Sequence, residues 1–386
     1  MSEAQPAQFR VLIWTGAFEP GFRAGGPIRS LAGIVDSLPT DIEVHVITRD
    51  RDLGSAEPYP GLSGKWVQRG RAIVLYLDTR SVRQWVEAVA MLHRARYELL
   101  YVNSLWSPIF TVIPILARAV RVIGAKAILI APRGELSPGA LSLKARKKAI
   151  AIHLWGGMLR RLGVTWHATS EGEAGHIRAI FPWAQVVINQ SQAALPLSPI
   201  APLGGESGEV RLVFIGRIVP KKNLSLTLMA LQHADTPIVF DIFGPIEDVD
   251  YWSFCQSLMA RLPKQVMARY QGELQPFKVR ATFAAYDAFV FPTLGENFGH
   301  VIAESLSASC PVVCSEDTPW SATLRTGGGA VVAPLSVDNL RAALERIARM
   351  TPRDRMGARE EAGRAYLAWR KTAAGPNILE QVSRCA

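Results

Sequence analysis

The feature that most constrains the fold is an alternation of short apolar, β-branched runs with stretches of helical periodicity along most of the 386 residues. The runs predict strands at 9–16, 42–49, 72–77, 98–104, 126–132, 164–170, 185–189, 211–218, 237–244, 269–274, 288–293, 311–315 and 330–334. Strands that alternate with helices form βαβ units and parallel sheets. Several runs are apolar throughout, as expected of strands covered by helices on both faces. The sequence therefore predicts an α/β protein with parallel sheets.

The alternation is interrupted between 191 and 209, where three prolines and three glycines give the composition of a linker. At about 100–200 residues per domain, the length of the chain also favours two domains. We expect one domain at 1–190, a linker at 191–209, a second domain at 210–370 and a final segment at 371–386. Two such domains are expected to be Rossmann-like and to face a central cleft, with ligands outside the carboxyl ends of the strands.

The net charge of +10 is concentrated in the first half of the chain. Residues 1–200 contain 23 Lys and Arg against 14 Asp and Glu, and no acidic residue occurs between 136 and 170. That interval holds Lys144, Arg146, Lys147, Lys148, Arg160 and Arg161, with apolar residues between them at helical spacing. A basic amphipathic helix of this kind binds an anionic membrane surface or another anionic ligand. The alternative is a helix packed on the core with a solvated basic edge. Nucleic acid is not expected as a partner, because no base-stacking aromatic motif or nucleic-acid module is present.

The cysteines and the first residues bear on location. Four cysteines are too few for a disulfide scaffold, and Cys310 and Cys314 flank an apolar run that predicts two core thiols rather than a metal site. The first ten residues lack the basic start and apolar core of a signal peptide. We therefore expect a cytoplasmic protein, with the inner face of the plasma membrane as its peripheral site.

The most informative segment runs from Phe291 to Glu304, with the sequence FPTLGENFGHVIAE. A strand ends at Pro292, and after a turn with two glycines a helix begins near Gly299. The amide groups and the positive dipole end at a helix N-terminus suit a phosphate, and Glu296 and Glu304 offer acceptors for sugar hydroxyls. The alternative is an ordinary helix whose first turn is acidic.

Two further segments point to an anionic ligand. In VFIGRIVPKKN, a strand leads into a turn from which Arg217 and Lys222 can converge on a diphosphate. In the loop from Glu19 to Ser30, Gly25 and Gly26 precede a helix with proline at its start, and they permit close approach of a phosphate or a sugar. The loop lacks the GxGxxG spacing of a dinucleotide site, and no P-loop sequence occurs.

Together, the GRIVPKKN segment, the two glutamates eight residues apart around NFG, and the following CPVV resemble the retaining GT-B glycosyltransferases of family 4, the group 1 glycosyltransferases. The resemblance covers nearly the whole chain. It implies a nucleoside diphosphate sugar bound mainly by the second domain, with the final segment crossing back onto the first. It further implies that Arg217 and Lys222 hold the diphosphate, and that Glu296 touches the donor sugar and Glu304 the ribose. These first three residues are the expected catalytic groups.

The resemblance also implies a wider donor site, in which backbone amides after Glu296 complete the sugar and phosphate contacts and two strand ends line the base pocket. The expected donor-binding residues are Gly25, Gly26, Gly216, Arg217, Lys222, Gly244, Glu273, Leu274, Glu296, Asn297, Phe298, Gly299, His300 and Glu304. Asn103 and Arg133 are expected to contact the acceptor.

Two positions depart from the family pattern. Arg133 stands where many members have a histidine, so it either takes over a contact to sugar or acceptor or reflects a shifted alignment. Asn189 begins NQSQ where members usually show a Pro-Asn-Gly turn. That turn shapes the hinge between the domains, so reduced activity is conceivable.

The function implied is transfer of a sugar, with retention of configuration, from a nucleoside diphosphate sugar to a saccharide or lipid-linked saccharide in bacterial-type polysaccharide assembly. The alternatives are a non-hydrolysing nucleotide-sugar epimerase and a catalytically silent nucleotide-sugar-binding relative. No cofactor and no metal are expected. The Asp-x-Asp triplets that begin at Asp50 and at Asp248 have simpler explanations than a metal site. The first lies in a loop whose arginines balance its charge, and the second lies at the start of a helix, where acidic residues are favoured.

Overall fold

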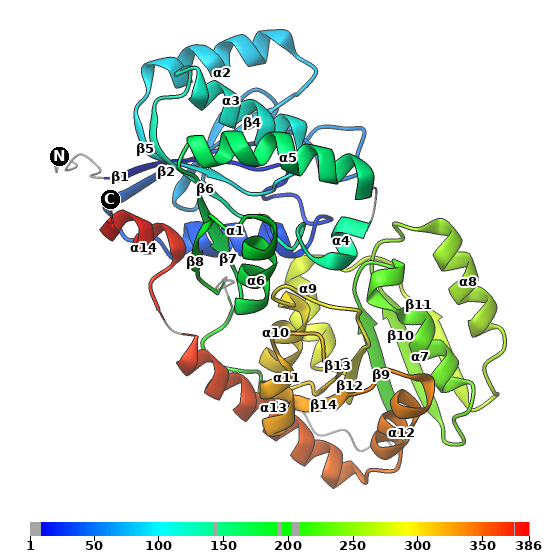
Figure 1. Cartoon of the computed structure of the whole chain (residues 1–386). Helices are drawn as coiled ribbons and strands as arrows, with labels where there is room; N and C mark the ends of the chain where they lie inside the picture. Colours follow the sequence, from blue (N-terminus) through cyan, green and yellow to red (C-terminus); the bar gives the residue numbers. More distant parts are fainter. Residues whose placement is uncertain (1–8, 143–144, 191–194, 203–208, 374, 386) are drawn as a thin grey trace. The chain divides into compact units, whose positions relative to one another are not determined.

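The computed structural model describes residues 9–142, 145–190, 195–202, 209–373 and 375–385. The chain divides into two compact units, an N-terminal unit of Met1–Ala194 with Gly375–Ala386 and a C-terminal unit of Leu195–Ala374. Each unit is built on a sheet with helices on both faces (Figure 1). The predicted α/β class with two parallel-sheet domains is confirmed.

The N-terminal unit contains an eight-stranded sheet in the order β3-β4-β2-β1-β5-β6-β7-β8. All pairs are parallel except β3 with β4. Its strands are β1 (Phe9–Trp14), β2 (Ile42–Arg49), β3 (Trp66–Arg69), β4 (Ala72–Leu77), β5 (Tyr97–Val102), β6 (Ala125–Ile130), β7 (Thr165–Ala168) and β8 (Gln185–Ile188). Its helices are α1 (Gly26–Asp36), α2 (Val82–Arg94), η1 (Pro108–Val112), α3 (Ile113–Ala119), α4 (Pro138–Ser142), α5 (Ala145–Arg161), α6 (Glu171–Ile180) and α14 (Ile378–Cys385).

The strands of this unit alternate between two cores because successive side chains point to opposite faces of a sheet. In β1, Leu12 and Trp14 face the core under α2, α3, α5 and α6, whereas Val11 and Ile13 face the core under α1 and α14. Figure 1 shows α2, α3 and α5 on one side of the sheet and α1 and α14 on the other. The helices are therefore fixed in place by burial of their apolar sides on a sheet that is apolar on both faces.

The last helix, α14, belongs to the N-terminal unit although it follows the whole C-terminal unit in sequence. Ile378 and Leu379 are fully buried in the core under α1. The side chain of Asn377 donates to the carbonyl of Ile34 and accepts from the backbone N–H groups of Leu379 and Glu380. The chain thus crosses back to its first unit at 375–385.

The C-terminal unit contains a six-stranded parallel sheet in the order β11-β10-β9-β12-β13-β14. Its strands are β9 (Val210–Ile215), β10 (Ile238–Phe243), β11 (Val266–Tyr270), β12 (Ala288–Phe291), β13 (Val312–Ser315) and β14 (Gly329–Val332). Its helices are η2 (Pro220–Lys222), α7 (Leu224–Leu231), α8 (Val249–Met259), α9 (Pro276–Phe283), α10 (His300–Ser307), α11 (Ser321–Thr323), η3 (Leu324–Gly328), α12 (Val337–Ala348) and α13 (Pro352–Thr372).

Cysteines in this unit are core residues, as predicted. Cys310 and Cys314 are fully buried in the apolar cluster, and burial raises the pKa of each thiol to about 12. Cys255 is also buried and unbridged. No helix in the part of the chain that the structure describes is both long and apolar enough to cross a membrane.

The predicted strands coincide with observed strands, with ends that differ by up to three residues, apart from two larger differences. Strand β3 was not predicted, since it has four residues, is partly exposed and pairs antiparallel with β4 at the sheet edge. Strand β11 runs from Val266 to Tyr270, whereas the prediction placed it at 269–274. In the expected linker, 191–194 and 203–208 lie outside the described residues, and Leu195 and Ile200 pack on the C-terminal core.

Candidate functional site

Three glycines mark the carboxyl ends of neighbouring strands in the C-terminal unit. Gly216 follows β9, Gly244 follows β10 and Gly272 lies beyond β11. The N–H of Gly216 donates to the carbonyl oxygen of Phe243, and the N–H of Gly244 donates to the carbonyl oxygen of Gly272. A Cβ on Gly244 would lie 1.9 Å from the carbonyl oxygen of Gly216, and φ of Gly244 is +140°. Only glycine fits this close approach of two backbones.

Lys222 and Glu296 meet at this edge as an ion pair, with 2.5 Å between Nζ and Oε1. Lys222 is the last residue of the short helical turn η2 after β9, and Glu296 lies between β12 and α10. The Thr293 hydroxyl also donates to Oε1 of Glu296, at 2.8 Å. Both charged side chains are about 12–13 % exposed. Lys222 is therefore largely covered, by Glu296 and by the ring of Phe291.

Arg217 is paired with Glu247, a residue that the sequence analysis did not single out. Its Nη1 donates to both carboxylate oxygens, at 2.9 and 3.1 Å, and the Arg217 side chain is 40 % exposed. Burial lowers the pKa of neighbouring Lys221, with Glu296 opposing that shift and the charges of Lys222 and Arg217 adding to it. Three cations and two carboxylates are therefore gathered at the end of β9.

The helix α10 begins at this cluster. Its N-cap is Gly299, in the left-handed conformation with φ +78°, and His300 is the first helical residue. Phe298 and His300 are buried, with their ring centroids 4.6 Å apart. Glu304 lies one turn into the helix. The amide groups at the start of α10 and the positive end of its dipole provide potential for an anion.

The strand ends predicted to line a base pocket lie along the same edge. Gly244 accepts from the hydroxyl of Tyr270 at 2.9 Å, and the ring of Tyr270 packs on Trp252 with centroids 4.9 Å apart. Glu273 is exposed just beyond β11, and Leu274 packs partly on the C-terminal core. The structure thus places all the predicted donor residues of this unit at the carboxyl edge of one sheet or in the helix that starts there.

In the N-terminal unit, Gly25 and Gly26 lie where β1 passes into α1. Gly25 is the N-cap of α1 with φ +69°, and Gly26 begins the helix. The preceding loop is held by Asp52, whose carboxylate accepts from the N–H groups of Phe22 and Arg23 at 3.0 to 3.3 Å. Asp52 is 8 % exposed. Asp52 therefore shapes the loop before α1 through contacts with residues about 30 positions away.

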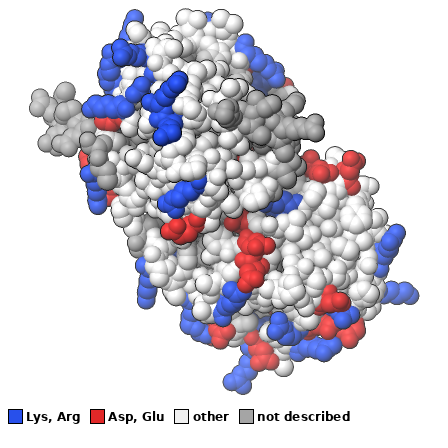
Figure 2. Space-filling view, in the orientation of Figure 1, with Lys and Arg blue, Asp and Glu red and all other residues white. Residues whose placement is uncertain are grey.

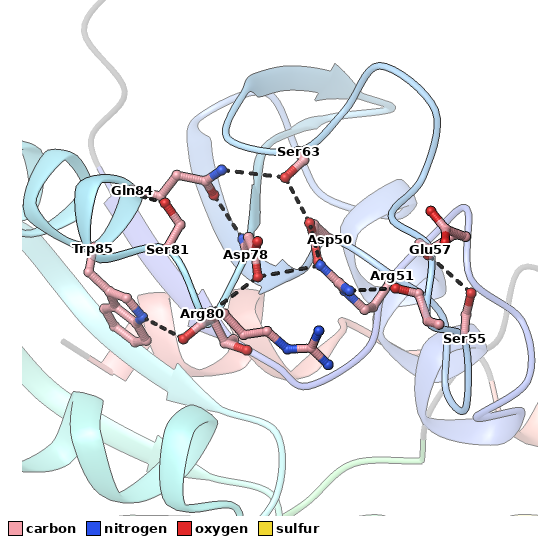
Figure 3. A network of polar contacts seen from close by, with 12 residues as sticks. Asp50, Arg51, Ser55, Glu57, Ser63, Asp78, Arg80, Ser81, Gln84 and Trp85 are labelled. Carbon is pink, nitrogen blue, oxygen red and sulfur yellow. Dashed lines mark hydrogen bonds and ion pairs between the residues drawn. The ribbon is translucent and has the colours of Figure 1, made fainter.

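Asp50, the other acid of that triplet, has a separate network (Figure 3). Its carboxylate accepts from Arg51 Nε at 2.8 Å and from the Ser63 hydroxyl at 2.7 Å, and Arg51 also pairs with Asp78. Local neutralisation of Asp50 by an arginine is confirmed. Asp248 caps α8 by accepting from the N–H of Tyr251 at 2.9 Å, as its predicted helix-start position requires.

Asn103 and Arg133 lie together at the carboxyl ends of β5 and β6. Arg133 Nε donates to Asn103 Oδ1 at 2.6 Å, and its Nη2 donates to the Tyr101 hydroxyl at 2.8 Å. Tyr101 contacts Nδ1 of His167 at 2.8 Å, and Nε2 of His167 lies 3.0 Å from the carbonyl oxygen of Asn189. Because that carbonyl only accepts, His167 donates from Nε2 and accepts the Tyr101 proton at Nδ1.

Asn189, the second departure from the family pattern, has a structural role in this network. Its side-chain amide donates to the carbonyl of Pro376 at 2.9 Å, and so it joins the end of β8 to the segment that leads into α14. Burial lowers the pKa of His167 to about 3, with the charge of Arg133 adding to the shift, so this ring is neutral. His167 therefore has a structural role between Tyr101 and Asn189.

Ser170 caps α6 by accepting from the N–H of Glu173 at 3.2 Å. The Glu173 carboxylate accepts from the N–H groups of Gly134 and Thr169. Of the predicted basic helix, Lys144 lies outside the described residues, as do the side chains of Arg146, Lys147 and Lys148; Arg160 and Arg161 are exposed on α5.

Comparisons with known proteins agree with this geometry. Residues 201–363 match the family model described as "Glycosyl transferases group 1". O-antigen chain mannosyltransferase B of Escherichia coli is 29 % identical over 136 residues, which is 34 % of this chain and 34 % of that protein. The matched stretch therefore spans about a third of that curated relative.

Similar folds occur in solved structures. Sucrose-phosphate synthase of Thermosynechococcus elongatus has a TM-score of 0.74 at 16 % identity and covers 98 % of this chain and 99 % of its own. Anabaena Alr3699/HepE in complex with UDP and glucose has a TM-score of 0.69 at 14 % identity, covering 97 % and 98 %. Residues 201–363 are therefore similar to the group 1 glycosyltransferases, and the fold of the chain is GT-B.

Proposed function

We propose that the protein transfers a sugar, with retention of configuration, from a nucleoside diphosphate sugar to a saccharide acceptor. The observation that carries the proposal is the cluster of Arg217, Lys222 and Glu296 beside the start of α10, within the segment that matches the group 1 family. A diphosphate needs cations and N–H donors, and a sugar needs acceptors for its hydroxyls. This edge of the sheet offers both kinds of group.

The chemistry asked of these residues is stabilisation of the leaving group. When the bond between the anomeric carbon and the diphosphate breaks, negative charge develops on the diphosphate oxygens. Lys222, Arg217 and the amide groups at the start of α10 suit that charge, and preorganised donors of this kind give large rate effects. Diphosphate binding would also draw Lys222 and Arg217 from their present partners, Glu296 and Glu247.

With Lys222 drawn to the diphosphate, Glu296 becomes available to a donor hydroxyl, and Thr293 continues to orient its carboxylate. Glu304, one turn into α10, serves the ribose in this proposal. Gly25 and Gly26 bring the start of α1 to the donor phosphates, and Asn103 and Arg133 contact the acceptor. The positive charge at Arg217 and Lys222 supplies what a divalent cation otherwise provides, so the proposed reaction uses no metal.

The proposed acceptor is a saccharide, lipid-linked in the setting of bacterial polysaccharide assembly. The Escherichia coli relative is named for O-antigen chain synthesis, and this supports the setting. Its name also makes mannose a first donor sugar to test, and the UDP and glucose bound to HepE make glucose the second.

The experiment is a panel of nucleoside diphosphate sugars, in which mannose and glucose donors with each common base are incubated with the protein and saccharide acceptors. Release of nucleoside diphosphate with a product that keeps the anomeric configuration of the donor, read by NMR, is the expected result. Interconversion of the nucleotide sugar without release would identify the epimerase alternative. Binding without either reaction would identify the catalytically silent relative.

The proposed location is the cytoplasm, peripheral on the inner face of the plasma membrane. Helices α2 and α3 cover the same face of the N-terminal sheet, and each exposes an apolar stripe. The stripes consist of Val82, Val86 and Val89 on α2, and of Ile113, Leu116 and Val120 on or next to α3. No acidic residue occurs between 99 and 134, the interval that holds α3, and on α2 the exposed Glu87 is paired with Arg83. Figure 2 shows more Lys and Arg than Asp and Glu over this unit. Apolar side chains among cations suit an anionic bilayer surface.

Vesicle co-sedimentation tests this location. The wild-type protein is expected to bind vesicles of anionic lipid at low salt and to be released by salt. Val86→Glu combined with Leu116→Glu should abolish binding. Phe277→Glu, at an even more exposed apolar residue of the C-terminal unit, is the control and should bind normally. Equal binding by all three proteins would contradict the proposed surface.

A further inference from the structure

The loop that carries Glu296 is hydrogen-bonded to one short segment, 315–320, which begins at the last residue of β13. The Ser315 hydroxyl donates to the carbonyl oxygen of Thr293, and the N–H of Glu296 donates to the carbonyl oxygen of Asp317 at 3.1 Å. The indole Nε1 of Trp320 donates to the carbonyl oxygen of Phe298. Three hydrogen bonds therefore join this segment to the start, the middle and the end of the loop.

Trp320 is the most constrained residue of that segment. Its side chain is 1 % exposed and belongs to the core of the C-terminal unit. Its ring packs on Phe298 with centroids 5.6 Å apart, and on Trp369 of α13 with centroids 4.5 Å apart. A buried indole held by two aromatic neighbours provides a fixed donor, because the ring has no room to turn.

The hydrogen bond from Trp320 fixes the orientation of a peptide group in the donor loop. The carbonyl of Phe298 and the N–H of Gly299 belong to one planar trans peptide and point in opposite directions. When Trp320 holds the carbonyl on its own side, the N–H of Gly299 is turned away from Trp320. A side chain at Gly299 would be strained by its φ of +78°, and its Cβ would lie 3.1 Å from Cδ1 of Ile302, a tight contact.

We propose that Trp320 is a positioning residue, which sets the Phe298–Gly299 peptide and thereby aims the amide groups at the start of α10 toward the donor. Ser315 acts in the same way on Thr293, whose hydroxyl orients Glu296. This inference rests on the proposed function, because the amide groups matter for turnover only if a diphosphate or a sugar binds against them. The orientation of the peptide itself is a property of the free protein.

Trp320→Phe is the variant that tests the proposal, because it keeps an aromatic ring and removes the N–H donor. Trp369→Phe is the matched control, since it makes the same change in the same aromatic cluster, at a residue whose ring contacts Phe298 with centroids 6.0 Å apart. In the free protein, amide hydrogen exchange over 294–305 should be faster in Trp320→Phe than in Trp369→Phe. With the donor identified by the panel, kcat should fall about 10- to 100-fold in Trp320→Phe alone, because small misplacements of catalytic groups have effects of this size.

KM for the donor should change less than kcat, and the melting temperatures of the two variants should be similar. If Trp320→Phe does not fold, Ser315→Ala provides the second variant, with the same expected loss in kcat and faster exchange. Equal exchange and equal kcat in the Trp320 and Trp369 variants would overturn the positioning role. Failure of the wild-type protein to bind any nucleotide sugar would instead contradict the proposed function, and the exchange comparison would still decide the orientation of the loop.

Discussion

At the scale of single residues, the positive charges of the candidate site are already paired with carboxylates. Lys222 is paired with Glu296 and Arg217 with Glu247, so the two cations proposed to bind a diphosphate already have carboxylate partners. Charge-assisted hydrogen bonds of this kind keep long side chains in one geometry. A bound diphosphate would then replace Glu296 and Glu247 as the partner of cations that are already in position.

Substitution of Lys222 or Arg217 by alanine should weaken nucleoside diphosphate binding about 10- to 150-fold each, since a hydrogen bond to a charged group contributes about 1.5–3 kcal/mol. Calorimetry with the nucleotide found in the donor panel measures the loss. Arg325→Ala is the control, because it breaks an exposed ion pair with Glu316 in the same unit. Unchanged affinity in both site variants would remove these two residues from the site.

His167 predicts a pH dependence of stability in the N-terminal unit. Its pKa is about 3 in the folded chain and about 6.5 when exposed, so below pH 6.5 the unfolded chain binds a proton that the folded chain does not. The free energy of unfolding should therefore fall as the pH is lowered from 6.5 toward 4, by up to about 1.4 kcal/mol per pH unit. Urea titrations at several pH values measure this slope.

His167→Gln is the matched variant for that titration, because it keeps a side-chain donor and acceptor without the ionisable ring. Between pH 6.5 and 4, the free energy of unfolding of this variant should change less with pH, by about 1.4 kcal/mol per pH unit, because one proton fewer is taken up on unfolding. If the slopes of the two proteins coincide, His167 is not the group that titrates.

At the scale of elements, the sequence carried more information about strands than about the contacts between them. The runs around β2 and β4 predicted both strands to the residue, since β-branched residues alternate with polar ones in β2 and β4 is apolar throughout. Strand β3 escaped prediction because its four residues are partly exposed. The proposed donor residues, such as Glu296 and Gly299, were singled out by the family resemblance of the motif that holds them. By contrast, the contacts of Asp52 and Trp320 depend on residues more than 20 positions away.

The C-terminal helix α14 allows a test at this scale. Leu379 is fully buried against α1, so Leu379→Ala should lower the free energy of unfolding of the N-terminal unit by about 2–5 kcal/mol. Chemical denaturation followed by a probe in that unit measures the change. Val82→Ala, at an exposed position of α2, is the control and should stay within about 0.5 kcal/mol of wild type. A wild-type midpoint in Leu379→Ala would contradict the docking of α14.

At the scale of the whole molecule, the proposed chemistry needs no divalent cation, because Arg217, Lys222 and the start of α10 provide positive potential for the diphosphate. Turnover should therefore persist in excess EDTA. Asp250→Ala should also remain active, since Asp250 lies in the first turn of α8 beside the N-cap Asp248. Loss of turnover in EDTA with recovery on addition of magnesium or manganese would contradict this part of the account.

The central claim is that the protein transfers a sugar from a nucleoside diphosphate donor through the Lys222–Glu296 cluster. Its most direct test is the rate of nucleoside diphosphate release from the preferred donor in wild type, Lys222→Ala and Arg325→Ala. The account predicts acceptor-dependent release by wild type and by Arg325→Ala, and a loss of about 10-fold or more in kcat/KM for Lys222→Ala. Equal release by all three proteins, or release by none with any donor, would contradict it.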